Sequence, residues 1–559
     1  YYKYKLYDNI IKLGKLTQKC FNNKHKISSH KSSELTFNCC AILGIKSFFQ
    51  SSKISTSGKL SFSNYSLCEI IERTVNKKSE KNNTLEYKYT DNFYDELNEN
   101  IYYFCIPENI NRLKERLFIE CNACIAISNE CNCIELFLEL SNISWCPINI
   151  TFQGSNSKVN EWYMKKIFIR NSWLIPEENI DKNNDDNIGN KRKYNNNHSK
   201  KANQHVVNKK ENYEGGKVLE PVYGLHTEEI FLVDFQSMFP SIIEKYNICY
   251  TPNNKHKIIP KHMNYLMLKR NKAKSLIKTT GDNNDILQHC LKLLANSNYG
   301  CFAYTGFRFF NILIAREITR VSRLILEESA KFVENIPQCK IIFGDTDSLG
   351  IRYSGEQKNR DIIIDNITKN IHSKFLIKLK LEHIIPKCFI YTKKSWSYIL
   401  PTGERIDKGM ATIMRNFPKL TKDNIGLFLE YILSLSFESN SDIISHINYI
   451  AKKIASIINQ EKNDKIKKRP IEDFVIFKTL GKHISDYTSD INYKNQNVKL
   501  LPQHVRVAIN MMNKGDCYFI KGDSIPFVLC EGDIVCHPKE LEYNDKGALI
   551  DTEKYLSRM

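Results

Sequence analysis

Three aspartates are the residues of this sequence best suited to chemistry. Asp345 and Asp347 lie in "KIIFGDTDSLGIRY", in a tight turn between two runs that read as β-strands, and Asp234 ends the apolar run "EEIFLVDF". An isolated D-x-D pair is more often a solvated hairpin tip, because aspartate favours turns and disfavours strands. If the strands are neighbours in one sheet, however, the three carboxylates converge and cannot all stay ionised without a cation.

The ligand types predict which cation such a site would hold. Hard carboxylate oxygens, with no histidine or cysteine nearby in the sequence, favour Mg²⁺. Two ions roughly 3.5 to 4 Å apart activate an attacking hydroxyl and stabilise a leaving phosphate. The aspartates therefore indicate phosphoryl transfer with two Mg²⁺ ions as cofactors.

Residues 260–300 supply positive and amide side chains that suit a triphosphate. The segment reads as two helices separated at Gly281. Candidate ligands are spaced four residues apart on each helix: Arg270 and Lys274 on the first, and Lys292 and Asn296 on the second. Either pair alone is more simply a solvated helix face. Together with the aspartates, both pairs indicate a site for the remaining phosphates.

The overall composition allows several domains and favours a polyanionic partner. The chain has 559 residues, with 81 Lys and Arg against 62 Asp and Glu, which gives a net charge of +19. An Asn- and Lys-rich composition bias would also produce this excess. No apolar run reaches the length of a membrane-spanning helix, so we expect no membrane partner.

The order of segments predicts an α+β protein with more than one domain. Residues 1–145 mix strand-like runs such as "IYYFCI" with helix-like runs such as "NINRLKERLFIE". Residues 181–212 are almost wholly polar and are expected to be a disordered insertion. Their "KRK" reads as a solvated charge run or as a nuclear signal. From about residue 400 the chain is mostly helical, with strand-like pieces such as "IPFVLC", and we interpret the sequence as a fragment of a longer protein.

The cysteines indicate reduced thiols rather than a disulfide framework. There are 18, scattered along the chain, with no secretory leader. The dense cluster in "CNACIAISNECNC" comprises Cys121, Cys124, Cys131 and Cys133. Six residues between the two pairs are few for a tetrahedral zinc site, and the cluster runs into the helical "IELFLEL". We therefore expect no zinc, with a zinc knuckle as the alternative.

Three segments, in order, resemble the polymerase motifs of family B DNA polymerases. They are "DFQSMFPSII", "KLLANSNYG" and "GDTDS", where the family has D-x-x-S-L-Y-P-S-I, K-x-x-x-N-S-x-Y-G and D-T-D-S. The first reads as a strand followed by a turn through Pro240. "YEGG" resembles the Y-x-G-G segment that touches the template strand. The similarity covers roughly residues 120–559 and favours the alpha type, the primase-associated branch, over the delta or zeta type.

The resemblance implies a right-handed palm, fingers and thumb, with a remnant of an RNase H-like exonuclease domain. The implied domains are an inactive exonuclease-like part at 1–145, palm at 146–257, fingers at 258–300, palm again at 301–395 and an incomplete thumb at 396–559. At the family's Y-x-x-x-D exonuclease motif this chain has Phe118 and Asn122. Because an amide is a poor substitute for a metal-binding carboxylate, we expect no proofreading.

The resemblance also implies roles for single residues in catalysis. Asp234 and Asp347 match the two metal-bridging aspartates, and Asp345 matches the accessory one. The backbone carbonyl of Phe235 is a further expected metal ligand. Lys292 matches the proton donor to the leaving pyrophosphate.

The implied nucleotide and DNA contacts form two larger sets. The expected nucleotide-binding residues are Phe235, Ser237, Met238, Phe239, Arg270, Lys274, Lys292, Asn296, Tyr299 and Thr346. The expected DNA-binding residues are Tyr213, Gly215, Gly216, Gly300, Lys393, Lys394, Trp396, Lys408, Gly409 and Arg415.

Several positions depart from the family pattern. Phe239 stands for the tyrosine that excludes a 2′-OH, so its ring is kept without the hydroxyl. Phe343 and Trp396 each replace a tyrosine, the first before G-D-T-D and the second in K-K-x-Y. In the following thumb motif, Ala411, Met414 and Asn416 replace an acid, an arginine and an aspartate, which predicts a weaker grip on the duplex.

The activity implied is template-directed addition of dNTPs to a primer 3′-OH, with extension of primase-made RNA primers in the nucleus. Expected partners are primer–template, as RNA/DNA or DNA/DNA, and dNTPs, together with primase and an accessory B-type subunit bound through a C-terminal region beyond this sequence. A different class of function, a catalytically weak scaffold that binds primed DNA, is the alternative. The complete carboxylate set favours the enzyme.

Overall fold

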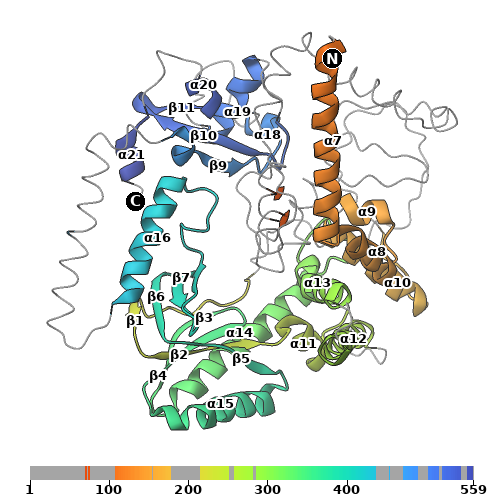
Figure 1. Cartoon of the computed structure of the whole chain (residues 1–559). Coiled ribbons are helices and arrows are strands. Elements are labelled where there is room, and N and C mark those ends of the chain that lie inside the picture. Colours follow the sequence, from red (N-terminus) through yellow and green to blue (C-terminus); the bar gives the residue numbers. More distant parts are fainter. Residues whose placement is uncertain are drawn as a thin grey trace. The chain divides into compact units, whose positions relative to one another are not determined.

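The computed structural model divides the chain into two units, each described here by itself (Figure 1). The described residues are 107–153, 155–177, 214–250, 257–280, 285–435, 470–488, 501–514, 519–542 and 550–557, with Ile70, Ile71, Thr74, Val75 and Lys452. The first unit, called the helical unit, includes Ile70–Asn184 and Tyr265–Phe310, and the second, called the sheet unit, includes Asp185–Asn264 and Asn311–Met559. The strand-like "IYYFCI" and the polar insertion 181–212 fall outside the described residues.

The helical unit has the helices that its apolar periodicity predicts. They are α7 (Pro107–Glu130), α8 (Cys133–Ser144), α9 (Ile148–Gln153), α10 (Asn156–Arg170), α12 (Ile258–Thr280) from Tyr265 onward, and α13 (Asp285–Phe302). Helix α13 packs against α8 and α10. Its buried positions, which include Leu291, Leu294 and Asn298, recur at helical spacing. This leaves the opposite stripe of α13 for polar side chains.

The sheet unit is built on a four-stranded antiparallel sheet. Its strand order is β3 (Cys339–Asp345), β4 (Ser348–Tyr353), β2 (Glu229–Phe235) and β5 (Leu379–Ile385). The strands that the sequence predicts on both sides of Asp345 and Asp347, and before Asp234, are therefore present. A second sheet has the order β1 (Gly224–His226), β6 (Lys387–Thr392), β7 (Ser395–Ile399) and β8 (Arg405–Lys408).

The two faces of the first sheet pack against different elements. Ile230 and Leu232 of β2 share a core with residues of the second sheet, including Ile390 and Trp396. Residues that alternate with them point the other way, and there α14 (Ile312–Glu334) packs against β3 and β4 while α15 (Arg360–Phe375) packs against β5 (Figure 1). Both faces are buried, which explains why β2 reads as a continuous apolar run.

Helix α11 (Met238–Lys245) follows β2 directly and corrects one expectation. The sequence predicts a turn through Pro240, but Pro240 lies in the first turn of this helix. A proline is tolerated there because the first helical N–H groups have no partner within the helix. The change of direction comes earlier, at Ser237, which has a left-handed backbone with φ 49°.

The C-terminal part of the sheet unit forms its own core around a three-stranded sheet. Its elements are α16 (Lys419–Ser434), η8 (Ile471–Phe474), β9 (Ile476–Thr479), α18 (Ile484–Thr488), α19 (Gln503–Lys514), β10 (Ser524–Cys530), η10 (Glu531–Asp533), β11 (Ile534–Cys536), α20 (Pro538–Glu542) and α21 (Thr552–Leu556). The short helix η5 (Gln357–Asn359) is not part of this core and directly precedes α15. Strand β10 contains the predicted "IPFVLC". The fully buried Tyr555 donates its hydroxyl hydrogen to the carbonyl of Phe474 at 2.7 Å and accepts from the N–H of Leu529 at 2.9 Å. This side chain therefore ties α21 to both β10 and η8.

None of the described helices combines the length and hydropathy needed to cross a bilayer.

An aromatic stack fixes the second sheet against β3. The ring of Phe343 stacks on Trp396 with centroids 4.8 Å apart and an angle of 25° between the planes. The same ring lies over Gly350, its register partner on β4, where an added Cβ would overlap it. Phe343 and Trp396, which both stand where the family pattern has tyrosine, therefore contact each other. The stack leaves no room for a side chain at Gly350.

We expect G350A to lower the free energy of unfolding by about 1–3 kcal/mol, the range typical of overpacking a core. The ring of Phe343 cannot move aside, because Trp396 lies against it. Urea unfolding of G350A and wild type measures the effect.

The variant F343L provides the matched background. The smaller side chain should reduce the cost of G350A, so the two substitutions should be non-additive. G300A serves as a control, because an added Cβ at Gly300 on α13 would meet nothing within 4 Å. Equal costs of G350A with and without F343L would show that the Phe343 ring is not the obstacle.

Candidate active site

Strand β4 brings Asp234 and Asp345 to the same end of the first sheet. Ser348, the first residue of β4, is the register partner of Asp234 on one side and of Asp345 on the other. Cross-strand partners in antiparallel sheets project to the same face. Both carboxylates therefore lie on the face that is turned toward the second sheet, at the last residues of β2 and β3. Both residues are half-buried.

Asp347 is held in the turn between β3 and β4 by backbone hydrogen bonds. The N–H of Phe235 donates to the carbonyl of Asp347 at 2.8 Å, so the end of β2 is tied to this turn. The N–H of Asp347 donates to the carbonyl of Asp345 at 2.6 Å. Between them, Thr346 has φ 59°. A β-branched residue rarely adopts such a left-handed backbone, which costs on the order of 1–3 kcal/mol.

Neighbouring groups hold Thr346 in this strained conformation. Its N–H donates to the carbonyl of Lys217 at 2.9 Å, and its hydroxyl donates to a carboxylate oxygen of Asp345 at 3.0 Å. An added Cβ at Gly216 would lie 2.9 Å from the Thr346 side chain. The segment that contains Gly215 and Gly216, predicted to touch the template, thus lies directly against the aspartate turn.

The electrostatics of the turn show crowded negative charge. The pKa of Asp347 is raised, first by burial and then by the nearby carboxylates of Asp345 and Glu382. A backbone hydrogen bond and Lys394 lower this pKa but do not cancel the increase. A cation placed among these carboxylates would relieve the repulsion and reverse the shift.

Glu382 is a carboxylate near the site that the sequence motifs miss. The register of β5 against β2 shifts between Leu232 and Val233, which leaves Glu382 as the extra residue of a β-bulge. The only signal in the sequence is an acid within the strand-like "LKLEHII". Pairing across the sheet, which no local pattern reveals, brings its charge close to Asp347.

Lys394 and Lys393, predicted to contact the duplex, bind carboxylates of their own unit. Lys394 Nζ lies 3.2 Å from an oxygen of Asp345, and Lys393 Nζ lies 2.5 Å from an oxygen of Glu220. Both lysine side chains are at least half exposed, so each pair contributes little stability. The lysines can therefore exchange these carboxylates for phosphates at small cost.

The hairpin that carries these lysines requires a glycine at position 409. Gly409 has φ 60°, and an added Cβ would overlap the carbonyl oxygen of Lys394. Lys408 pairs with Trp396 across β7 and β8 and is exposed. Asp407 fixes the following loop by accepting hydrogen bonds from the hydroxyls of Ser397 at 2.5 Å and Thr412 at 2.6 Å.

The structure places the remaining predicted residues of the sheet unit as follows. Met238 is buried, Phe239 is half-buried and Arg415 is half-buried. Tyr213 lies outside the described residues.

The predicted nucleotide contacts of the helical unit lie on two helices. On α13, Lys292, Asn296, Tyr299 and Gly300 form one stripe opposite the buried face, at spacings of four, three and one residues. On α12, Lys274 is exposed, whereas Arg270 is half-buried and burial lowers its pKa. The spacing of each pair therefore places its side chains on a common helix face, as the sequence predicts.

A buried amide network fixes the rotation of α13. The fully buried Asn160 on α10 donates to the hydroxyl of Ser297 at 2.8 Å and accepts from the side chain of Asn298 at 3.2 Å. Next to it, the buried carboxylate of Glu161 binds Lys165 at 2.8 Å and Arg308 at 3.4 Å. The motif search identifies the segment "NEWYMKKIF" but not this role of Asn160.

The chemistry of the turn fits the expected Mg²⁺, although no ion-binding cluster is preformed. Within the described ranges, no three His, Cys, Asp or Glu side chains surround a common point. The donors are nevertheless oxygens on adjacent strands, and Asp345 and Glu382 add their negative charge to the burial that raises the pKa of Asp347. In the cysteine cluster, a hydrogen bond with Cys131 and burial raise the pKa of the Cys133 thiol. The expectation of no zinc there stays a prediction.

The two positions matched to the exonuclease motif lie one turn apart on α7. Phe118 is 68% exposed and Asn122 is half-buried.

Comparison with protein-family models gives one match that covers most of the chain. The model described as DNA polymerase family B matches residues 146–257 and 251–559. Among solved structures, the family B DNA polymerase of the archaeon Pyrobaculum calidifontis superposes with a TM-score of 0.51 at 20% identity, over 82% of this chain and 56% of that one. This likeness supports the predicted α+β polymerase fold.

Curated proteins similar to this chain carry a common name. The DNA polymerase alpha catalytic subunits of rice and mouse are 28% and 27% identical, over 78% and 84% of this chain. The matched parts are 31% and 33% of those proteins, so the chain spans about a third of their length. The resemblance predicted from the motifs is thereby confirmed.

Replacing Asp347 by asparagine should stabilise the metal-free protein at neutral pH. Because its pKa is raised, the folded chain holds this proton more tightly than the unfolded chain, where aspartate titrates near about 3.9. Stability therefore falls as the pH rises from the ordinary pKa through the raised one, and the penalty persists at pH 7. In EDTA, D347N should melt above the wild type at pH 7, by a margin that shrinks toward pH 4.

D361N, which changes an exposed carboxylate on α15, should shift the melting temperature little. Added Mg²⁺ should stabilise the wild type more than D347N, because an ion that binds the folded state raises its stability. A D347N protein that melts at or below the wild type at pH 7 in EDTA would contradict the crowding of these carboxylates.

Proposed function

Since the chain belongs to DNA polymerase family B, we propose that it is an alpha-type DNA polymerase that extends a primer 3′-OH on a template. The observation that supports this best is the register of β4, which places Asp234 and Asp345 on one face with Asp347 in the adjoining turn. A scaffold that only binds DNA has no physical need for three carboxylates gathered at one end of a sheet.

Asp234 and Asp347, with the backbone carbonyl of Phe235, would hold the two Mg²⁺ ions, and Asp345 would support them. When bound, the ions activate the primer hydroxyl and neutralise the charge that develops on the phosphates. The side chains of the protein would mainly position the primer hydroxyl and the triphosphate, because the protein forms no covalent bond in an in-line phosphoryl transfer.

The α13 stripe would bind the triphosphate, with Lys292 as the proton donor to pyrophosphate and Asn296 as a phosphate ligand. Arg270 and Lys274 on α12 would contact the same phosphates. The half-buried Phe239 would pack under the sugar and exclude a 2′-OH by its ring alone. Ser237, Met238, Tyr299 and Thr346 complete the proposed nucleotide contacts.

Primer–template would bind along the Gly215–Gly216 segment and the hairpin of Lys393 and Lys394. In the free protein these lysines neutralise Glu220 and Asp345, and on binding they would contact phosphates instead. The net charge of +19 supports a salt-dependent affinity for DNA. We further propose, from the alpha-type motif resemblance, a nuclear role with primase in the extension of RNA primers.

Primer extension with Mg²⁺ and dNTPs, on RNA-primed and DNA-primed templates, tests the proposal. D347N and D234N should each lower the rate by at least about 10²-fold, because each removes a ligand to ions that contribute several kcal/mol. Binding of primed template, measured by fluorescence anisotropy, should remain.

D361N, which changes an exposed carboxylate outside the site, serves as the folding control. No extension by a wild-type preparation that still binds primed template would favour the scaffold. Extension that survives in D347N would exclude the proposed metal site.

We also propose that the chain lacks 3′→5′ exonuclease activity, because Phe118 and Asn122 occupy the motif positions of a tyrosine and a carboxylate. A 5′-labelled primer incubated with Mg²⁺ and no dNTPs should keep its length. Progressive loss of 3′-terminal nucleotides that N122D increases would place an active exonuclease site on this helix.

A further inference from the structure

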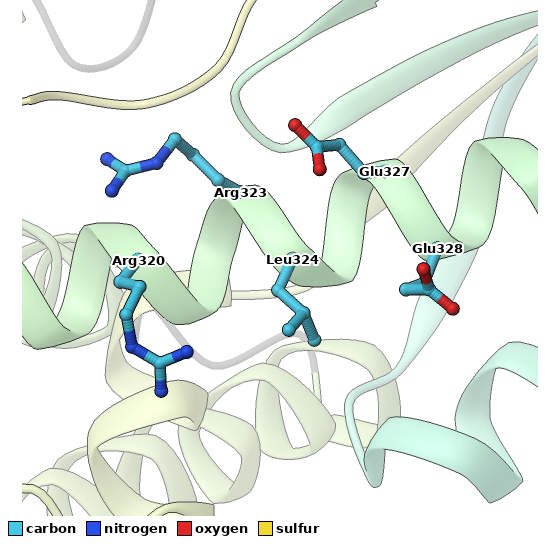
Figure 2. Close-up of a pocket in the computed structure, with 5 residues that line it drawn as sticks. All are labelled: Arg320, Arg323, Leu324, Glu327 and Glu328. Atoms are coloured by element: carbon cyan, nitrogen blue, oxygen red, sulfur yellow. The ribbon is translucent and has the colours of Figure 1, made fainter.

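One side of α14 binds residues 214–217, the segment that contacts Thr346 in the aspartate turn. Thr319, Arg323 and Glu327 recur every four residues and so form one stripe along this helix. Figure 2 shows Arg323 and Glu327 leaving α14 on one side, while Arg320 and Glu328 leave on the opposite side. The two arginines, only three residues apart, therefore have different surroundings.

Arg323 binds backbone rather than solvent. Its guanidinium donates to the carbonyl of Glu214 at 2.8 Å and to the carbonyl of Gly215 at 2.7 Å, and it lies 3.3 Å from the Glu214 carboxylate. Its side chain is only 18% exposed, although it is charged. Nη1 donates both of these hydrogen bonds while Nη2 lies by the carboxylate, an arrangement that the rigid planar fork of a guanidinium allows.

Two further contacts hold the same segment. The hydroxyl of Thr319 lies 2.9 Å from the carbonyl of Glu214, and Glu327 binds Nζ of Lys217 at 2.9 Å. The three side chains of the stripe thus hold residues 214–217 from both ends. We call this group the α14 bracket.

The held segment in turn holds Thr346. The carbonyl of Lys217 accepts from the N–H of Thr346 at 2.9 Å, and the absence of a Cβ at Gly216 admits the Thr346 side chain. Thr346 lies between Asp345 and Asp347 with a left-handed backbone at φ 59°. Such a conformation persists only when its surroundings enforce it.

We propose that Arg323 is a positioning residue for the catalytic turn: through residues 214–217 it holds Thr346 left-handed and so sets the geometry of Asp345 and Asp347. The catalytic part of this inference rests on the proposed polymerase activity. The structural part, that Arg323 controls the order of the turn, does not.

Hydrogen–deuterium exchange of the free protein tests the structural part. In R323A and in R323K, the amide of Thr346 should exchange at least about tenfold faster, since the acceptor at Lys217 is no longer held. R323K keeps the charge but has a single nitrogen, so it cannot reproduce the fork in which Nη1 donates to both carbonyls while Nη2 lies by the Glu214 carboxylate. R320A is the matched control. Arg320 lies on the same helix and donates to Glu317 at 2.7 and 2.8 Å. Its removal should therefore leave the exchange rate of the Thr346 amide unchanged.

Exchange at Thr346 that is unaltered in R323A, or raised equally in R320A, would overturn the proposal. Neither result depends on any polymerase activity, so failure of the bracket and failure of the proposed function are distinguishable. Melting temperatures identify a variant that has simply lost its fold, and R323K, the milder change, then decides.

The catalytic part predicts a division between kinetic constants. In primer extension, R323A should lower kcat at least about tenfold while KM for dNTP stays within about twofold, and the Mg²⁺ concentration for half-maximal rate should rise. R320A should change none of these. A rise in KM for dNTP with an unchanged kcat would place Arg323 in nucleotide binding instead and contradict the inference.

The strain at Thr346 allows a cycle that is specific to this mechanism. Asparagine tolerates a left-handed backbone better than threonine does. In a T346N background, R323A should therefore lower kcat by a smaller factor than it does in the wild type. If the two losses multiply, Arg323 acts elsewhere than on this turn, and the proposal fails.

Discussion

The site depends on the antiparallel register of β4 with both of its neighbours. Ser348 faces Asp234 on β2 and Asp345 on β3, so the two carboxylates share a face only in this alignment. A shift of either pair by one residue would move one aspartate to the face covered by α14 and α15, because side chains alternate along a strand. The apolar residues of β2 resist such a shift, since Ile230 and Leu232 would then leave their core.

The same alignment concentrates negative charge that the fold must tolerate. Burial and neighbouring carboxylates raise the pKa of Asp347, and the compensating positive charge comes from the exposed Lys394, which other ligands can bind. Strain adds to this cost, because Thr346 stands between the aspartates in a conformation that threonine disfavours. The turn is thus stable through its surroundings rather than through its own preferences, as is usual where a protein arranges groups for function.

Local patterns predict the elements of the site but not the contacts between them. The strands around Asp234 and Asp345, and helices α12 and α13, follow from apolar runs and helical spacing that act over a few residues. The motif spacing likewise leads to the family. Three features escape this reading, because each depends on residues far apart in sequence: the bulge at Glu382, the network of Asn160 and the role of Arg323. Pro240 misleads for a different reason, since proline both ends helices and begins them.

The stack of Phe343 on Trp396 has a consequence for how these sequences diverge. Position by position, the chain departs from the family pattern once before G-D-T-D and once in K-K-x-Y. In the folded protein the two departing residues stack on each other, and Gly350 lies against the Phe343 ring. The residue that fits at position 343 therefore depends on the residue at position 396, and the reverse. A tyrosine placed at only one of the two positions would pack against the unchanged Phe343 or Trp396. A count that treats the two positions separately therefore counts one structural difference twice.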